Sequence, residues 1–316
     1  MRKLIPGLCV CALLAAGCGS KSSSSTPTVD VALDFVPNAV HAPLYEAVRT
    51  GADRRHGIHI HIVEPGSSPD SLKALLTGRA KVGVLDIQDL GIAQLKGRDV
   101  VGIAALVQRP LGALVSLPSI TRPRDLEGKT VGVSGLPSDP AFVSAIVKHD
   151  GGDPSKIHEV TIGFEAVNAL LAKKVVSVPA FWNAEGVTLR RKGLPVHEFK
   201  IDSYGAPPWP EVVLATTRAT LDKDRATIAK FVAAVQDGAR AELRDPGATA
   251  RDIARASDSK DLGLVRAQLD AVRPILDPKL RLQRAVLEQW ADFGARIGLL
   301  SGRPDVARTF DFSLAR

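Results

Sequence analysis

Hydrophobic and polar positions alternate along this chain with two different periods. Up to about residue 216, short apolar runs rich in β-branched residues are bounded by glycine, proline and asparagine, a pattern typical of strands. The predicted strands are Val29–Leu33, Ile58–Val63, Val82–Leu85, Val100–Ala105, Leu114–Leu117, Thr130–Val133, Glu159–Ile162, Val176–Val178, Val196–Phe199 and Val212–Thr216. Helical patterns separate many of them, so the alternation indicates an α/β fold with a parallel sheet.

The last third of the chain carries apolar residues at helical spacing instead. Ile228, Phe231, Val232 and Val235 fall on one face of a helix predicted over Leu221–Leu243. Further helices are predicted over Ala250–Ala256, Leu262–Ile275 and Ala285–Ile297. We therefore expect an α/β body that is completed by helices packed back onto it.

The first residues have the pattern of an export signal. Arg2 and Lys3 precede the apolar run Leu4–Ala16, which is shorter than the roughly 20 residues of a membrane-spanning helix. Small residues and Cys18 follow, an arrangement that resembles a bacterial lipoprotein signal. The resemblance implies a signal peptide over residues 1–17, acylation of Cys18, and a flexible tether over residues 18–28. The expected location is the extracytoplasmic face of the cell membrane, with a lipid anchor.

Composition narrows the classes of function. The formal net charge is +7, but the charges are scattered and no basic stripe with interleaved aromatic residues suggests binding to nucleic acid. Cys9 and Cys11 lie within the expected signal peptide, so Cys18 is the last cysteine, and neither a disulfide nor a thiolate metal site is expected. No catalytic signature stands out. We expect no catalytic residue, no metal and no cofactor.

A histidine cluster is the candidate that comes nearest to a metal site. His59 and His61 fall on one face of a predicted strand and Ile60 on the other. With His56 close by, two histidines in this spacing could bind a metal, but they also suit the polar outer face of a half-buried strand. The sequence favours the polar face and leaves any role of the cluster open.

Several turns place aromatic and polar side chains directly after predicted strands, where parallel strands commonly face a ligand. The candidate ligand-binding residues are Asp34, Phe35, Asn38, His41 and Tyr45 in a first turn, Trp182, Asn183 and Glu185 in a second, Pro208 and Trp209 in a third, and Asp86 and Gln88 beside the strand Val82–Leu85. Aromatic faces would enclose a flat ring, and the Asp86 and Glu185 carboxylates would accept hydrogen bonds from its donors.

These segments resemble the thiamine-pyrimidine-precursor family of ABC-transporter substrate-binding proteins. The resemblance is carried by Leu33-Asp34-Phe35-x-Pro37-Asn38-x-x-His41, Glu64-Pro65-Gly66, Asp125-Leu126-x-Gly128-Lys129 and Phe181-Trp182-Asn183-x-Glu185-Gly186. It implies a two-lobed periplasmic-binding-protein fold of type II, with two interlobe crossings near Leu106–Leu114 and Tyr204–Val212. Lobe one would comprise residues 29–107 and 204–316, lobe two residues 108–203, and ligand would close the hinge between them.

The resemblance also implies roles for individual residues. The positions that match the family's pocket are Phe35, Asn38, His41, Tyr45, Glu185 and Trp209. Phe35 stands where relatives often stack a tryptophan on the ligand, and Glu185 matches an acidic residue that can bind a pyrimidine amino group. The chain departs from the family at residues 51–55, where Gly-Ala-Asp-Arg-Arg replaces Gly-Tyr-Phe. The implied function is a monomeric lipoprotein that binds a flat nitrogen heterocycle, such as a thiamine pyrimidine precursor, and delivers it to an ABC permease.

Two alternatives remain at this point. The same fold could bind riboflavin, which is also flat, or an alkanesulfonate, taurine or nitrate, although Asp86 and Glu185 argue against an anion. A pyrimidine synthase is the alternative of another class, because fungal relatives on this fold resemble such enzymes. Those enzymes use a lysine that holds pyridoxal phosphate and a cysteine-rich iron-binding run. The aligned stretch Val84–Gln88 has no lysine, so we do not expect an enzyme.

Overall fold

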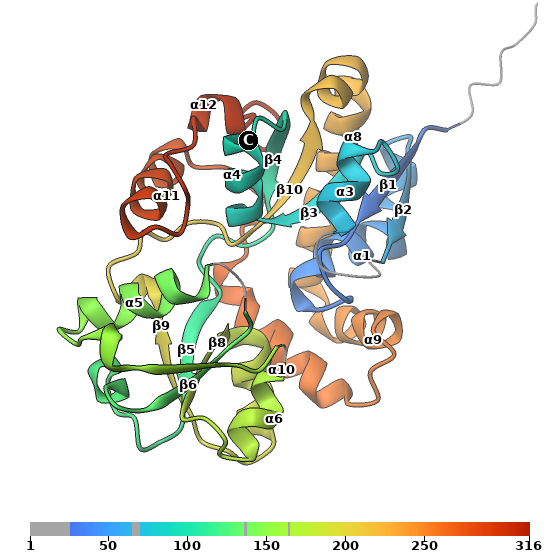
Figure 1. Cartoon of the computed structure of the whole chain (residues 1–316). Helices are drawn as coiled ribbons and strands as arrows, with labels where there is room; N and C mark the ends of the chain where they lie inside the picture. The colour runs from blue at the N-terminus through green and yellow to red at the C-terminus, as the bar shows by residue number, and fades with distance from the viewer. Residues whose placement is uncertain (1–25, 65–69, 136–137, 164) are drawn as a thin grey trace, which may run out of the picture.

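The computed structural model describes residues 26–64, 70–135, 138–163 and 165–316. Within them the strands form two separate sheets, one in each of two lobes (Figure 1). The strand order is β2-β1-β3-β10-β4 in the first sheet and β7-β6-β8-β5-β9 in the second. The expected signal peptide, Cys18 and most of the expected tether lie outside the described residues.

Each strand that the hydrophobic pattern predicts is present, with small shifts at the ends. The first sheet contains β1 (Thr28–Ala32), β2 (His59–Val63), β3 (Val82–Asp86), β4 (Val100–Ala105) and β10 (Val212–Thr217). The second contains β5 (Gly112–Ser116), β6 (Thr130–Val133), β7 (His158–Thr161), β8 (Ser177–Phe181) and β9 (His197–Lys200). Alternating burial of β2, with Ile60 buried and His59 and His61 exposed, follows its sequence pattern.

The prediction of a parallel sheet is only partly correct, because both sheets are mixed. Strand β1 runs parallel to β2 and β3, but β10 runs antiparallel between β3 and β4. In the second sheet β6 runs parallel to β7 and β8, whereas β5 runs antiparallel between β8 and β9. Both antiparallel strands directly follow a crossing between the sheets, so each enters its sheet from the opposite end.

Helices cover the sheets and then form the C-terminal third (Figure 1). They are α1 (Ala42–Arg49), α2 (Ala52–Arg55), α3 (Asp70–Leu76), α4 (Ile87–Leu95), α5 (Asp139–His149), α6 (Ala166–Leu171), α7 (Val187–Arg191), α8 (Arg218–Arg244), α9 (Pro246–Ala256), α10 (Leu262–Val272), α11 (Arg284–Ile297) and α12 (Val306–Thr309). Side chains of Thr217, Asp245 and Asp261 cap the starts of α8, α9 and α10 by accepting backbone N–H groups. Among the described residues, no helix combines the length and the apolar character that crossing a membrane requires.

The chain passes from the first sheet to the second between β4 and β5, and returns between β9 and β10. The predicted pair of crossings is therefore confirmed. Helix α10 contacts the short helix η1 (Ala39–His41), which follows β1, and also contacts α7 and the π-helix η4 (Trp182–Gly186), which follow β8. Because α10 contacts elements that follow strands of both sheets, the exact lobe boundaries stay a prediction.

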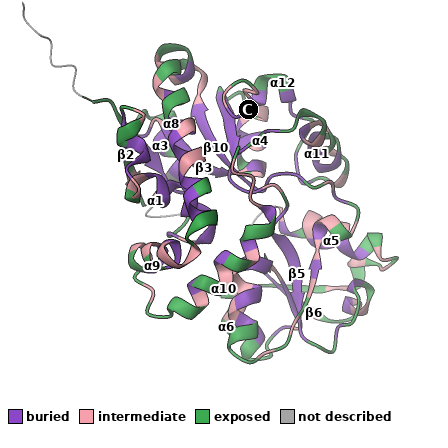
Figure 2. Cartoon of the chain, turned by 180° about the vertical axis from the view of Figure 1, so that it is seen from behind, coloured by how far each residue is buried: buried purple, intermediate pink, exposed green. Residues whose placement is uncertain are grey.

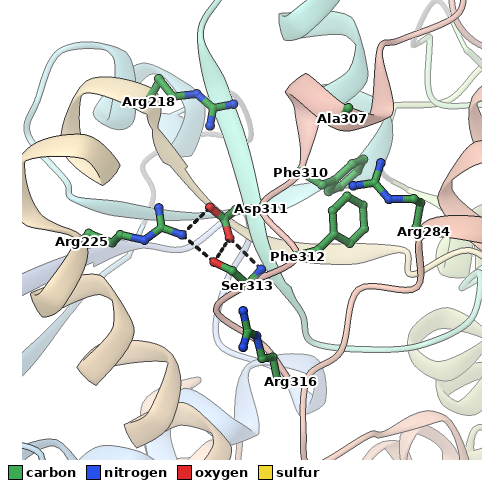
Figure 3. Close-up of a pocket in the computed structure, with 9 residues that line it drawn as sticks. All are labelled: Arg218, Arg225, Arg284, Ala307, Phe310, Asp311, Phe312, Ser313 and Arg316. Carbon is green, nitrogen blue, oxygen red and sulfur yellow. Dashed lines mark hydrogen bonds and ion pairs between the residues drawn. The ribbon is translucent and has the colours of Figure 1, made fainter.

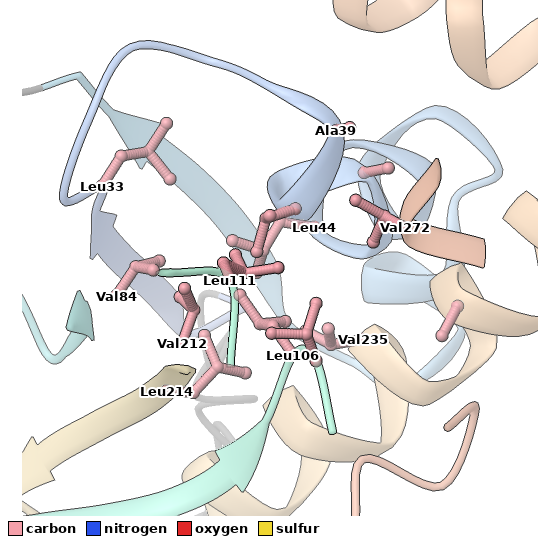
Figure 4. Packing of buried hydrophobic residues seen from close by; sticks show 14 of the residues in the cluster. Leu33, Ala39, Leu44, Val84, Leu106, Leu111, Val212, Leu214, Val235 and Val272 are labelled. Carbon is pink, nitrogen blue, oxygen red and sulfur yellow. The ribbon is translucent and has the colours of Figure 1, made fainter. Parts of the chain in front are cut away.

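The first crossing is part of the hydrophobic core. Figure 2 shows that buried positions concentrate in the strands and on the inner faces of the helices. Figure 4 shows Leu106 and Leu111 of the crossing among Leu44, Val212 and Val235 of the first lobe. The same cluster continues to Val115 and Val178 in the second sheet. The two lobes are thus joined by packed side chains, whose burial from water stabilises their arrangement.

Candidate functional site

The turn after β1 is held in place by its own polar side chains. The Asn38 side chain accepts a hydrogen bond from Val40 N at 2.9 Å and caps η1. Nδ1 of His41 accepts from Asn38 N at 3.3 Å, so Nε2 carries the proton and donates to Asp34 Oδ1 at 2.7 Å. His41 is buried, whereas the side chain of Phe35 is 53% exposed. The turn therefore presents an aromatic ring at the surface beside a fixed His–Asp pair.

Tyr45 follows this turn on α1 and is packed against the core. Its hydroxyl oxygen is buried and has no hydrogen-bond partner among the described residues. Burial, together with the nearby Glu64 carboxylate, raises the pKa of the Tyr45 hydroxyl to about 12. The hydroxyl is therefore neutral at physiological pH and can both donate and accept.

The second turn is the π-helix η4, which follows β8. Trp182 Nε1 donates to the Pro110 carbonyl at 3.0 Å, and the Lys200 ammonium lies 3.7 Å from the centroid of the Trp182 ring. Trp182 is only 7% exposed and belongs to the core cluster. Its ring thus serves mainly to anchor the turn, and a ligand would have to compete with Lys200 for it. Isolated π-turns of this kind occur often at functional sites.

Two polar residues close to Trp182 in the sequence, Glu185 and Asn183, could hydrogen-bond a ligand. Glu185 Oε2 accepts a hydrogen bond from Phe181 N at 3.0 Å. Burial raises the pKa of the Glu185 carboxyl, and the backbone N–H groups of Glu185 and Phe181 offset part of the rise. Asn183 is buried, and its Oδ1 atom has no partner in the described part of the chain.

A buried carboxyl pair lies where β3 ends and β10 begins. Asp86 is the last residue of β3 and pairs in register with Val212, which follows Glu211. Glu211 Oε2 accepts from Leu111 N at 2.8 Å. Burial and then the Glu211 charge raise the pKa of Asp86 well above its usual range. Burial also raises the pKa of Glu211, although the hydrogen bond from Leu111 N–H and the one from Asp86 offset part of the rise.

Glu211 is a functional candidate that the sequence interpretation missed. It precedes a strand that was expected to run parallel to β3, and a parallel β10 would place Glu211 at the far end of the sheet from Asp86. Because β10 is antiparallel to β3, the first residue before β10 lies beside the last residue of β3. The sequence interpretation selected the aromatic residues of the turn Tyr204–Trp209 as candidates and did not consider Glu211.

The third turn is mostly structural. Trp209 is 1% exposed, and its ring centroid lies 5.7 Å from that of Phe293 on α11. Pro208 beside it is exposed. In this structure the Trp209 ring is packed into the core against α11, and its contact with a ligand stays a prediction. Only its Nε1 atom is left without a hydrogen-bond partner among the described residues.

The turns are joined through one residue, Leu111, and one helix, α10. Leu111 accepts a hydrogen bond from Trp182 N at 3.0 Å through its carbonyl and donates to Glu211 through its N–H. Helix α10 contacts both η1 and η4, so it lies against the His41 turn and the Trp182 turn. Asp34 is also close enough to Asp86 to contribute to the rise of its pKa.

Unpartnered polar atoms gather on the predicted residues. The buried atoms without a hydrogen-bond partner include Tyr45 Oη, Asp86 Oδ1, Gln88 Oε1, Asn183 Oδ1 and Trp209 Nε1. Others occur on Asp53, Glu242 and Trp290, so the property is enriched at these turns and not exclusive to them. A buried polar atom without a partner costs about 1–3 kcal/mol. Bound ligand would remove that cost.

Two cavities lie elsewhere on the described surface. One is lined by Gly205, Ala206 and Pro207 of the second crossing together with residues of α11, and the other by arginines near the C-terminus. Neither includes Phe35, Trp182 or Glu185. A single cleft that joins these three side chains therefore stays a prediction.

The histidine cluster does not form a metal site in the described residues. His56 Nε2 lies 2.9 Å from Asp237, His59 Nδ1 lies 3.6 Å from Asp53, and His61 Nδ1 lies 2.8 Å from Asp30. Each histidine has a different carboxylate partner, and no group of three or more potential ligands is found among the residues described. The arrangement matches the polar face that the sequence favoured.

Comparison with known proteins finds similarity to a binding protein and to enzymes. A model of the NMT1/THI5-like family matches residues 38–249, about two thirds of the chain. The chain is 27% identical to a formylaminopyrimidine-binding protein of Halalkalibacterium halodurans, over 83% of this chain and 81% of that protein. It is also 27% identical to a 4-amino-5-hydroxymethyl-2-methylpyrimidine phosphate synthase of Legionella pneumophila, over 53% of each chain.

The fold is that of a solved periplasmic protein. The aliphatic sulphonate binding protein SsuA of Escherichia coli superimposes with a TM-score of 0.75 at 15% identity, covering 92% of this chain and 99% of that one. At this identity the likeness concerns the fold alone. The expected two-lobed periplasmic-binding-protein fold is thereby confirmed.

Proposed function

Because the chain belongs to the NMT1/THI5-like family, we propose that it is an extracytoplasmic solute-binding protein of an ABC importer. Its ligand is a flat nitrogen heterocycle, such as a pyrimidine precursor of thiamine, bound between the turns that follow β1, β3 and β8. The relative that binds a formylaminopyrimidine is similar over most of both chains, which supports this ligand class.

One observation carries the proposal: unpartnered acceptor oxygens on the residues of these turns. Asp86 Oδ1, Gln88 Oε1 and Asn183 Oδ1 are buried and lack a hydrogen-bond partner among the described residues. An aminopyrimidine has a planar ring with exocyclic N–H donors, which suits such acceptors. A sulfonate or nitrate offers only acceptor oxygens and would face carboxyl groups, which is unfavourable.

Phe35 is the aromatic residue that is best placed to stack on the ligand. Its ring is exposed, whereas Trp182 lies under Lys200 and Trp209 lies against Phe293. The Asp34–His41 pair, Asn38 and Tyr45 form the wall next to Phe35, and Glu185 approaches from the second lobe. In this arrangement one face of the heterocycle stacks on Phe35 and its edge meets the buried acceptors.

The partners follow from the proposed class of protein. An ABC permease in the membrane receives the ligand, and a monomer suffices for delivery. The proposed anchor is a lipid on Cys18, after removal of residues 1–17. Mass spectrometry of membrane-extracted protein tests the anchor, because it would give an N-terminal peptide that starts at an acylated Cys18. An unmodified N-terminus at another residue would refute the anchor and leave the binding function untouched.

An enzyme of the synthase type is the alternative, since several relatives carry such a name. We favour binding because the stretch Val84–Gln88 contains no lysine to hold pyridoxal phosphate, and no cysteine follows Cys18. A pyridoxal absorbance band in the purified protein would favour the enzyme instead.

Calorimetric titration tests the proposed ligand directly. The protein is titrated with a formylaminopyrimidine, with riboflavin, and with an alkanesulfonate as an anionic control. Saturable binding of the pyrimidine at one site per chain supports the proposal, and its absence for every pyrimidine offered contradicts it. Tighter binding of riboflavin would keep the fold and the transport role but replace the ligand.

A further inference from the structure

A basic cavity, drawn in Figure 3, lies near the end of β10 where α8 begins, which is the end of the first sheet remote from the crossings. It has a volume of about 460 Å³, and four arginines line it, Arg218, Arg225, Arg284 and Arg316. Helix α8 starts with Arg218 directly after β10, and the last residue of β10 pairs with Val100 at the start of β4. Asp86 pairs with the opposite end of β10. The cavity is therefore separated from the proposed heterocycle site by the length of a strand, roughly 17–20 Å.

Two of the arginines are fixed by neighbouring groups. Nη2 of Arg225 lies 2.8 Å from Asp311 Oδ2 and donates to Ser313 Oγ at 2.5 Å. Nη2 of Arg218 donates to the Arg308 carbonyl at 2.7 Å. Guanidinium groups held in this way lose less side-chain freedom when a ligand binds.

The other two arginines have no acidic partner in the described part of the chain. The Arg284 guanidinium lies 4.0 Å from the centroid of the Phe312 ring, a cation–π contact. For Arg316, no side-chain hydrogen bond or ion pair is found among the described residues. Figure 3 shows both side chains around the cavity, opposite Arg218 and Arg225. Asp311 is the acidic side chain in the lining, so four guanidinium groups face one side-chain carboxylate.

We propose that this cavity binds a phosphate-type oxyanion, either free or as the headgroup of an anionic lipid. Arginine is the side chain best suited to this chemistry, because its planar fork donates two parallel hydrogen bonds to phosphate oxygens. The site is distinct from the proposed heterocycle site, where the unpartnered acceptor oxygens belong to a carboxyl group and two amides. Strand β1 begins at the same end of the sheet as the cavity (Figure 1), which turns the cavity toward the membrane if the chain is anchored through its N-terminal segment.

The test uses a chain that starts at Thr26, because all described strands and helices and the hydrophobic clusters lie after that residue. It is titrated with inorganic phosphate, and separately sedimented with phosphatidylcholine vesicles that contain or lack phosphatidylglycerol. The test variant is Arg284→Gln/Arg316→Gln, which removes two charges without breaking an ion pair. The matched control is Arg244→Gln/Arg251→Gln, which removes the same charge near the opposite end of α8.

We expect the test variant to bind at least about tenfold more weakly, the size of one charge-assisted hydrogen bond, and the control to match the wild type. Loss of phosphate binding alone identifies a free oxyanion as the ligand, and loss of phosphatidylglycerol-dependent sedimentation identifies a headgroup. The proposal is overturned if neither probe binds, or if the test and control variants lose binding equally. Thermal unfolding of each variant checks that the fold is retained.

Discussion

The carboxyl groups of Asp86 and Glu211 are buried beside each other, at the point where β3 ends and the antiparallel β10 begins. Asp86 ends β3, and Glu211 precedes β10 and accepts a hydrogen bond from Leu111 N in the first crossing. Because both pKa values are raised, the pair keeps a proton at pH values where an exposed aspartate is ionised. The end of the first sheet at which β3 ends and β10 begins is therefore linked to the first crossing through a protonated acid pair.

Because of the Asp86–Glu211 pair, the free energy of unfolding should decrease as the pH rises. The unfolded chain loses these protons near the ordinary carboxyl pKa of about 4, while the native state keeps them to higher pH. The stabilising contribution is thus fully present below about pH 4 and is lost as the pH rises through the raised pKa values. We expect the free energy of unfolding to fall less steeply with pH in Glu211→Gln than in the wild type.

Urea unfolding at a series of pH values measures this slope. Glu127→Gln is the control, because the N–H of Asp153 and the Lys156 ammonium lower the pKa of the partly exposed Glu127 carboxyl. Removal of the Glu127 carboxyl should not reduce the loss of the free energy of unfolding as the pH rises. Equal slopes for the wild type and Glu211→Gln would show that the buried pair does not hold the proton assigned to it.

The hydrophobic pattern was sufficient to locate the strands but not their direction. Val212–Thr216 is apolar whichever way the strand runs, and its antiparallel pairing depends on where the chain re-enters the sheet. For that reason Asp86 could be named from sequence as a candidate, but Glu211 could not. Similarly, Lys200 meets the Trp182 ring because β9 and η4 are brought together only by the second sheet.

Local chemistry was more predictable where it involves neighbours in sequence. The helix predicted over Leu221–Leu243 corresponds to α8, which ends at Arg244 directly before Asp245-Pro246-Gly247. The same residues start α9, with Asp245 as the cap and Pro246 in the first turn. The packing of Trp209 on Phe293 joins residues far apart in the chain, and no short-range pattern indicates it.

The hydrogen bond from Trp182 to Pro110 should contribute measurably to stability. Trp182→Phe keeps an aromatic ring under Lys200 but removes the Nε1 donor and leaves the Pro110 carbonyl without it. Trp290→Phe is the matched control, because Trp290 is fully buried and its Nε1 atom has no partner among the described residues. We expect Trp182→Phe to be the more destabilising of the two by about 1 kcal/mol in urea unfolding. Equal losses of the free energy of unfolding in the two variants would mean that only the smaller ring, and not the lost hydrogen bond, destabilises Trp182→Phe.

Close packing of α1 on α8 depends on a glycine. A Cβ atom on Gly238 would overlap the Pro43 carbonyl oxygen and lie 2.7 Å from Ala47 N, and both are backbone atoms. We expect Gly238→Ala to lower the free energy of unfolding by about 1–3 kcal/mol, because the helices must separate to admit the methyl group. At Gly247 the nearest atom is 3.5 Å from an added Cβ, so Gly247→Ala should be neutral or slightly stabilising. A neutral Gly238→Ala would contradict the contact.

Stacking of the heterocycle on Phe35 gives the sharpest test of the proposed site. Phe35 and its neighbour Val36 are almost equally exposed, at 53% and 54%, so truncating either changes the core little. If Phe35 stacks on the ligand, Phe35→Ala should weaken binding of the pyrimidine by roughly tenfold to a hundredfold, the range expected for loss of one base–aromatic contact. Val36→Ala should bind as the wild type does. Calorimetry gives both affinities, and thermal unfolding verifies that the two variants are equally stable. Equal affinity of the Phe35 and Val36 variants would place the aromatic contact elsewhere, and displacement of Lys200 from Trp182 would then be the arrangement to test.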